Sequence, residues 1–210
     1  YTHRPAPASS EKRPLSQGAN PYSDVACLES INLIGSHIVQ AVNDPVDENY
    51  DALMFAGMLA GIGFGNAGCH LPHGMSYAVA GLAKDYSPKG WPEDHPMVPH
   101  GISVIVNSPA VFRKTGPACS ERHWKAASAM GADLTDTKVE NGGDILADQI
   151  IGMMRDTGIP NGLSGVGYSL EDLDALTDRS YPQKRLIDNG PMPISREELK
   201  ELFRAAMSYW

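Results

Sequence analysis

Apolar residues in the first part of this chain recur every three or four positions, and this spacing constrains the fold more than any other feature. Along residues 21–42 the pattern is formed by Leu28, Ile31, Ile34, Ile38, Ala41 and Val42. An α-helix has 3.6 residues per turn, so these side chains share one face and predict an amphipathic helix. Asn20 and Pro21 supply a cap and a first-turn proline, and Asp44-Pro45 ends the helix.

The rest of the chain carries similar signals and no convincing pair of strands. Further helices are predicted at 47–67, 70–83, 100–113, 120–130 and 143–157, with a loop rich in proline and glycine at 84–99. Ser103–Val106 alone is also compatible with a strand. Ser169 and Ser195 are each followed three residues later by an acidic residue, so two more helices are expected to begin there. The prediction is an all-α multi-helix bundle, with an irregular connecting segment at 1–20 and one helical domain at 21–210.

Residues 52–83 carry no formal charge, which raises the question of a membrane span. The helix predicted at 47–67 is apolar all round, so we expect it to be central and buried. It is long enough for the lower range of membrane spans, but glycines dilute it and it runs directly into His70 and His73. We therefore expect no contact with a membrane.

Gly63–Gly68 matches the G-x-G-x-x-G pattern of dinucleotide-binding sites. That pattern functions where a strand ends and a helix begins, whereas here a predicted helix precedes it. These glycines are therefore assigned to close helix packing or to a loosened backbone before His70.

Composition excludes some classes of function. The chain has 17 Lys and Arg against 25 Asp and Glu, a net charge of −8, which argues against a nucleic-acid binder with a basic face. Its three cysteines are too few and too distant for a disulfide framework, so a reducing compartment is expected. The chain opens without Met, and we expect it to be a piece of a longer polypeptide.

Four of the seven histidines lie within 31 residues, at His70, His73, His95 and His100. Imidazole is a common ligand of Fe and Zn, and both His73 and His100 occur in Pro-His-Gly. From spacing alone, a metal site and histidines bonded to backbone carbonyls are equally supported. A self-contained Zn²⁺ module that uses Cys69 and His73, together with others of these histidines, is a third alternative.

The segments GIGFGNAGCHLPHGMSYAVAG (61–81) and VPHGISVIVNSPAVF (98–112) resemble the C-terminal domain of the iron-containing (group III) alcohol dehydrogenase family. The resemblance implies a dehydroquinate synthase-like helical fold and one divalent metal, Fe²⁺ or alternatively Zn²⁺, held by an aspartate and three histidines. Matched motif to motif, His73 and His100 occupy the third and fourth ligand positions. Tyr77 stands where many relatives have a histidine near the substrate, so the resemblance implies that it binds substrate or relays a proton.

Two departures from the family pattern concern what this chain lacks and what it adds. The aspartate-bearing helix and the nucleotide-binding domain, which precede this region in the family, are absent, so NAD(H) is expected to bind mainly to a missing N-terminal domain. The inserted 84–97 loop resembles the branch of the family that acts on hydroxyacids and 2-oxoacids. In that loop, Lys84 or Lys89 is a candidate to bind a substrate carboxylate.

The resemblance implies an oxidoreductase with small hydroxyacid and 2-oxoacid substrates. The expected reaction converts 4-hydroxybutyrate and 2-oxoglutarate to succinate semialdehyde and 2-hydroxyglutarate by metal-assisted hydride transfer. The expected location is mitochondrial in a eukaryote and cytoplasmic otherwise. The isolated fragment, with an incomplete metal site, is expected to be inactive, and the sequence specifies no oligomeric state.

Overall fold

The computed structural model describes residues 5–92 and 94–210, and within these ranges it contains helices and loops but no β-strand. The α-helices are α1 (Pro21–Asn43), α2 (Asp47–Ala67), α3 (Leu71–Gly81), α4 (His100–Ile105), α5 (Ser108–Ala129), α6 (Gly142–Asp156), α7 (Leu173–Ser180), α8 (Lys184–Ile187) and α9 (Arg196–Ala205). Single 3₁₀ turns occur at Ser10–Lys12, Val139–Asn141, Ser164–Val166 and Leu170–Asp172. The all-α prediction is confirmed.

Most helix boundaries follow the local signals in the sequence. Asn20 caps α1 by accepting a hydrogen bond from the Ser23 amide at 3.0 Å. At α9, Ser195 accepts from the Glu198 amide at 3.2 Å, and the Glu198 carboxylate accepts from the Ser195 amide at 3.0 Å. The capping box at Ser169 also forms, although it opens a 3₁₀ turn that leads into α7. These start signals were read correctly.

The region between residues 100 and 130 differs from the prediction. One helix was expected at 100–113, but α4 ends at Ile105 and α5 begins at Ser108, with Pro109 in its first turn. Proline is well tolerated there because the first amides of a helix have no partner within the helix. The separate helix predicted at 120–130 is confirmed, because non-helical backbone at Cys119 divides α5 at a kink and the part after it runs to Ala129. The strand considered for 103–106 does not form.

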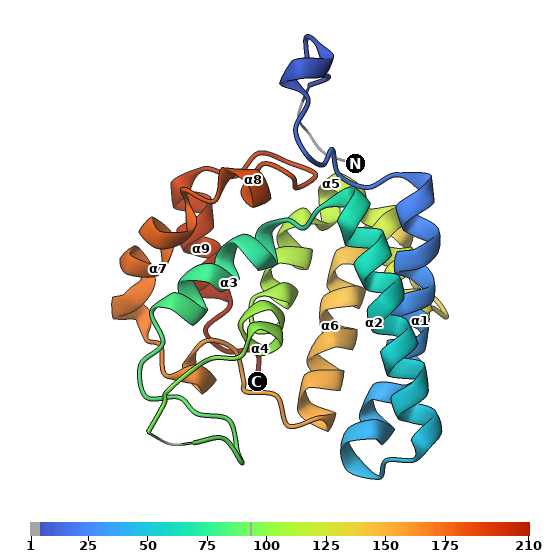
Figure 1. The fold of residues 1–210 in the computed structure, drawn as a ribbon, viewed down its shortest axis with the longest axis vertical. Coiled ribbons are helices and arrows are strands. Elements are labelled where there is room, and N and C mark those ends of the chain that lie inside the picture. The colour runs from blue at the N-terminus through green and yellow to red at the C-terminus, as the bar shows by residue number, and fades with distance from the viewer. Residues whose placement is uncertain (1–4, 93) are drawn as a thin grey trace.

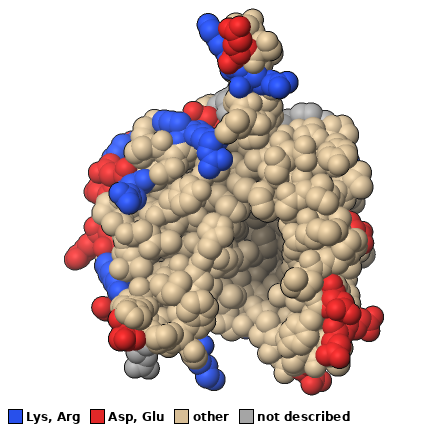
Figure 2. All heavy atoms as spheres, viewed as in Figure 1, with Lys and Arg blue, Asp and Glu red and all other residues tan. Residues whose placement is uncertain are grey.

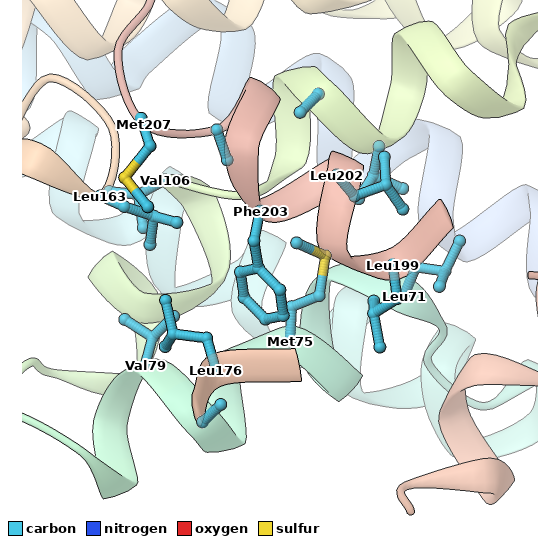
Figure 3. Close-up of a cluster of buried hydrophobic side chains, with 14 of the residues drawn as sticks. Leu71, Met75, Val79, Val106, Leu163, Leu176, Leu199, Leu202, Phe203 and Met207 are labelled. Atoms are coloured by element: carbon cyan, nitrogen blue, oxygen red, sulfur yellow. The ribbon is translucent and has the colours of Figure 1, made fainter. Parts of the chain in front are cut away.

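The helices form three groups side by side (Figure 1). The α1–α2 hairpin (residues 21–67) stands at one side, α3 to α6 occupy the middle, and α7 to α9 cover the other side. The main hydrophobic core lies between the middle group and the last one (Figure 3). Its fully buried members include Leu71, Met75 and Val79 of α3, Leu176 of α7, and Leu199 and Phe203 of α9. Helix α3 is therefore held firmly on its apolar side.

The expectation that the 47–67 helix is central and buried was wrong. Large apolar side chains of α2 point outward, and Met54 is 77% and Met58 53% exposed. Instead, the buried positions of α2 are the small or polar residues Asn49, Ala56, Gly63 and Ala67. These positions pack against α1, where Ser30 donates a hydrogen bond to the Ala56 carbonyl at 2.8 Å. An apolar pattern on all sides does not identify the face that a neighbouring helix covers.

Two parts of the chain are long and apolar enough to cross a membrane, judged by length and composition alone. Helix α1 meets this criterion by itself, and α2 meets it together with α3, although these two are bent by 107°. In the fold, α1 is tied to the rest of the molecule by polar contacts. Arg122 of α5 binds the carboxylate of Asp24 through two nitrogens at 2.6 and 2.9 Å, and Asn43 donates to the Asp156 carbonyl at 2.8 Å.

Candidate metal centre

The first turns of α3 and α4 bring His73 and His100 together. Their ring centroids lie 5.3 Å apart, with the ring planes inclined by 58°. His73 is half-buried and His100 is exposed, so the pair lies at the surface of the molecule. Burial lowers the pKa of His73, and the neighbouring His100 lowers it further. His73 is therefore neutral at neutral pH, which is the form of imidazole that binds metals.

Both histidines are fixed by the same local arrangement. Ser76 donates to the His73 carbonyl and Ser103 donates to the His100 carbonyl, each at 2.8 Å, and both serines are fully buried. The sequence contains the corresponding pattern, Pro-His-Gly-x-Ser, at 72–76 and again at 99–103. Sequence reasoning found the histidines but missed the serines, which the fifth position of this repeated pattern would have indicated.

The glycines after the two histidines are not equivalent. A side chain at Gly74 would lie 3.2 Å from Cγ1 of Ile187, so this glycine lets α8 approach the first turn of α3. Gly101 faces open space. Another element thus packs closely against the glycine after His73 and not against the glycine after His100.

The two imidazoles fit a shared divalent ion. A ligating nitrogen lies about 2 Å from Zn²⁺, so two rings on one such ion have centroids about 5 Å apart, close to the observed separation. Among the residues that the structure describes, no group of three or more His, Cys, Asp or Glu side chains could hold an ion. The chain therefore provides two donors of suitable type and spacing, and a complete set of ligands requires groups from outside it.

The closed Zn²⁺ module is contradicted by the same observation, because the described residues do not bring the cysteine and histidines of that alternative together. His95 is highly exposed, and its Nε2 lies 3.7 Å from the carboxylate of Asp94. Cys69 is half-buried, and burial raises the pKa of its thiol.

His70 lies one turn before His73 and caps α3 without a side-chain hydrogen bond. Its Nδ1 is buried and has no partner among the described residues. Burial lowers the pKa of His70 to about 4, and the neighbouring His123 and His73 lower it as well. A buried polar atom without a partner costs free energy, so this neutral imidazole is an unsatisfied group beside the candidate centre.

The remaining candidate residues lie on or near the same two segments. Tyr77 is four residues after His73, on the same face of α3, and its side chain is 43% exposed. The Lys84 ammonium is 2.6 Å from the carboxylate of Asp172 and 5.6 Å from the centre of the Tyr168 ring. Lys89 is exposed in the loop after α3. Lys84 thus already has a carboxylate partner within the chain.

A hollow opens in the face of the molecule that contains α4, α6 and α2, and Figure 2 shows its rim free of acidic and basic side chains. An apolar pocket of about 270 Å³ lies between α1, α6 and the end of α4. Its lining includes Ile38 of α1, Ile105 of α4 and Ile150 and Met153 of α6. Such a surface excludes water from its neighbourhood more readily than a charged one.

Comparison with known proteins assigns this arrangement to a family. Residues 14–207 match the sequence model described as the Fe-containing alcohol dehydrogenase family, C-terminal. Hydroxyacid-oxoacid transhydrogenase of Xenopus laevis, named as mitochondrial, is 44% identical over 98% of this chain. The protein of the same name from Homo sapiens is 41% identical over the whole chain. In both cases the match covers 45% of the relative, so the chain spans less than half of their length.

The fold is shared with solved structures. A 1,3-propanediol oxidoreductase superposes with a TM-score of 0.78 at 26% identity, over 91% of this chain and 47% of the other. An alcohol dehydrogenase from Oenococcus oeni gives the same TM-score at 24% identity. Together with the matched 194-residue range 14–207 and the Pro-His-Gly pair, these findings show that the chain belongs to the Fe-containing alcohol dehydrogenase family, of which it is the C-terminal domain.

Proposed function

We propose that this chain is the metal-binding part of an oxidoreductase that moves a hydride between a hydroxyacid and a 2-oxoacid. The observation that carries the proposal is the His73–His100 pair, with ring centroids 5.3 Å apart on two turns held by buried serines. The names of the relatives support the substrate class, a hydroxyacid and an oxoacid. Within that class, the proposed reaction converts 4-hydroxybutyrate and 2-oxoglutarate to succinate semialdehyde and 2-hydroxyglutarate.

His73 and His100 would hold a divalent ion, Fe²⁺ or alternatively Zn²⁺, with further ligands from outside this chain. When bound, such an ion supplies a Lewis acid that lowers the pKa of a substrate hydroxyl. The protein's own residues orient and protect the reacting groups. Burial keeps the His73 ring uncharged, and Ser76 and Ser103 fix the two turns. NAD(H) is assigned to the part of the relatives that this chain does not span.

Within this proposal, Tyr77 binds the substrate oxygen or relays a proton, because it follows His73 by one helical turn. Lys84 and Lys89 are the proposed groups for a substrate carboxylate. Both lysines are exposed, and Asp172 already neutralises part of the charge of Lys84. The mitochondrial names of the relatives support the same location for this protein in a eukaryote, with the cytoplasm as the location otherwise.

Metal binding by the 210-residue chain tests the proposal directly. Co²⁺ titrations monitored by visible absorption and calorimetry should show one site, and His73→Ala or His100→Ala should each weaken it about tenfold or more. His95→Ala is the matched control, because this exposed histidine contacts Asp94 rather than the pair. Equal affinity of His73→Ala and the unmodified chain would refute the assignment.

The substrate class is tested on the same Co²⁺-loaded chain. Adding 4-hydroxybutyrate should change the Co²⁺ spectrum, and butan-1-ol, which has no carboxylate, should bind more weakly. Lys89→Ala should reduce this preference more than Lys84→Ala, since Lys84 is paired with Asp172. If the acid and the alcohol bind equally, the carboxylate role of these lysines is wrong.

A further inference from the structure

Away from the His73–His100 pair, a second group of reactive side chains lies along α5. Cys119 Sγ is 3.1 Å from Nδ1 of His123, and Nε2 of the same ring is 3.0 Å from Oγ1 of Thr115. The three residues are spaced by four, so they lie on one face of the helix. A thiol, an imidazole and a hydroxyl thus form one continuous row.

The backbone at Cys119 departs from helical geometry within this row. Its φ of −155° and ψ of 45° interrupt α5 two residues after Pro117. The Cys119 carbonyl oxygen lies 2.9 Å from Nδ1 of His123, close to the thiol of the same residue. Both acceptors of Cys119, its carbonyl oxygen and its sulfur, therefore face one ring nitrogen.

This geometry suits a ring that carries protons on both nitrogens. Nδ1–H then donates to the Cys119 carbonyl and to a thiolate sulfur. Nε2–H donates to Thr115 Oγ1, which in turn donates to the Val111 carbonyl at 2.9 Å. Every group in the row has a partner in that state, so the site is arranged to receive the thiol proton.

Before any reaction the pair is neutral. Burial raises the pKa of the Cys119 thiol and lowers the pKa of His123. The other charged or titratable groups nearby are Arg122, which binds Asp24 of α1, and His70 of α3, which is separated from His123 by the Phe112 ring. The proton therefore moves to the ring only when sulfur begins to form a bond.

We propose that Cys119 is a nucleophilic thiol, activated by His123, and that it is a covalent modification site for small neutral electrophiles. In the step, a bond forms between Cys119 Sγ and the electrophilic carbon while the leaving group departs with its electron pair. Because Thr115 Oγ1 donates to the Val111 carbonyl, the neutral ring holds its one proton on Nε2, and Nδ1 takes the thiol proton before the ring returns a proton to water. Cys119 is half-buried at the kink, so part of the residue is open to solvent.

Cys27 and Cys69 are natural controls in the same molecule. Both are half-buried, and burial raises the pKa of both thiols. In the part of the chain that the structure describes, Cys119 is the cysteine whose sulfur is hydrogen-bonded to a histidine ring. All three cysteines are thus half-buried, and burial raises the pKa of all three thiols. The neighbouring histidine distinguishes Cys119 from the other two.

The test uses iodoacetamide on the 210-residue chain, with the modified peptides quantified by mass spectrometry over time. Near neutral pH, Cys119 should react about tenfold or more faster than Cys27 and Cys69. His123→Asn should bring its rate down to theirs and leave theirs unchanged, and Thr115→Val should have a smaller effect in the same direction. Equal rates at the three cysteines, or an unchanged Cys119 rate in His123→Asn, would overturn the proposal.

The pH profile of the unmodified chain decides the matter if His123→Asn fails to fold. A thiol that must ionise first reacts about tenfold more slowly for each pH unit below its pKa. Cys27 and Cys69 should show this slope, whereas Cys119 should lose little rate until His123 itself is protonated. Three parallel slopes would contradict proton transfer to His123.

Discussion

His70 shows at the level of one residue how burial near the candidate centre affects stability. The folded chain holds the pKa of His70 at about 4, mainly through burial, whereas an exposed histidine has a pKa of about 6.5. Between these two values the unfolded chain binds more protons than the folded one. The free energy of unfolding therefore falls as the pH decreases from about 6.5 to 4.

Replacing His70 should reduce this acid sensitivity. The shift at this one residue corresponds to about 3 kcal/mol of stability lost across the window, so His70→Leu should show a shallower decline. Urea denaturation at neutral pH and near pH 4.5 measures the effect. Burial also lowers the pKa of His73 and His123, so part of the decline should remain. His95→Leu is the exposed control, and a decline in His70→Leu as steep as in this control would contradict the prediction.

Residue-level features could be predicted from sequence only where the signal was local. Pro-His-Gly marked His73 and His100 as candidates, the family resemblance assigned them as a pair, and the structure places their rings side by side. The partner of Lys84 could not be predicted, because Asp172 is 88 residues away and comes near only through the fold. The unsatisfied Nδ1 of His70 likewise depends on the packing of α3 against α5.

Among the elements, the α1–α2 hairpin depends on small residues where its helices touch. A Cβ at Gly63 would collide with Sγ of Cys27 on α1, whereas a Cβ at Gly65 would meet nothing within 4 Å. The two glycines are two positions apart in the same helix, so they form a matched pair. A substitution at Gly65 changes only the helix propensity, whereas the same substitution at Gly63 also changes the packing against α1. Comparing the two positions therefore separates these effects.

Alanine at these two positions should have opposite effects. Gly65→Ala should raise the free energy of unfolding by up to about 1 kcal/mol, because alanine favours the helix. Gly63→Ala should lower it by about 1–3 kcal/mol, because the methyl group displaces the Cys27 thiol from its packed position. Chemical denaturation measures both, and the double variant Gly63→Ala with Cys27→Ala should recover part of the loss. A stabilising Gly63→Ala would show that the helices are not in close contact there.

Element boundaries and element burial were not equally predictable. Caps and prolines located the ends of α1 and α9 because these signals act within one turn. The burial of α2 could not be predicted, since its apolar residues surround the whole helix and do not mark the side that packs. The break before residue 120 was expected, but the helical part of α5 that starts at Ser108 and runs up to this break was not, because Pro109 was not read as a helix start.

At the scale of the molecule, the hairpin is attached to the rest mainly along α1 and α5. Asp24 pairs with Arg122 near one end, and Gly35 lies against the backbone of Met130 farther along α1. A Cβ at Gly35 would lie 2.6 Å from the Met130 carbonyl oxygen, so no side chain fits without moving the hairpin. This contact controls the distance between two of the three helix groups.

Gly35→Ala should therefore loosen the hairpin as a unit. Hydrogen exchange should become faster in α1 and α2, with little change in α7 and α9, because local opening follows cooperative units. Gly57→Ala, in the same hairpin but facing open space, is the control and should not accelerate exchange. Uniform acceleration throughout the chain would indicate global destabilisation instead of movement of the hairpin.

The corner between α2 and α3 joins three distant parts of the sequence. Gly18 donates from its backbone to the Ala67 carbonyl at 3.1 Å, and Asn189 donates to the carbonyls of Ala67 and Cys69 at 3.0 and 3.1 Å. The segment before α1 and the stretch after α8 thus both hydrogen-bond to the short piece of backbone at 67–69, just before His73. A displacement of either segment would therefore shift the backbone that leads into His73, so this corner couples the first residues of the chain to the candidate metal centre.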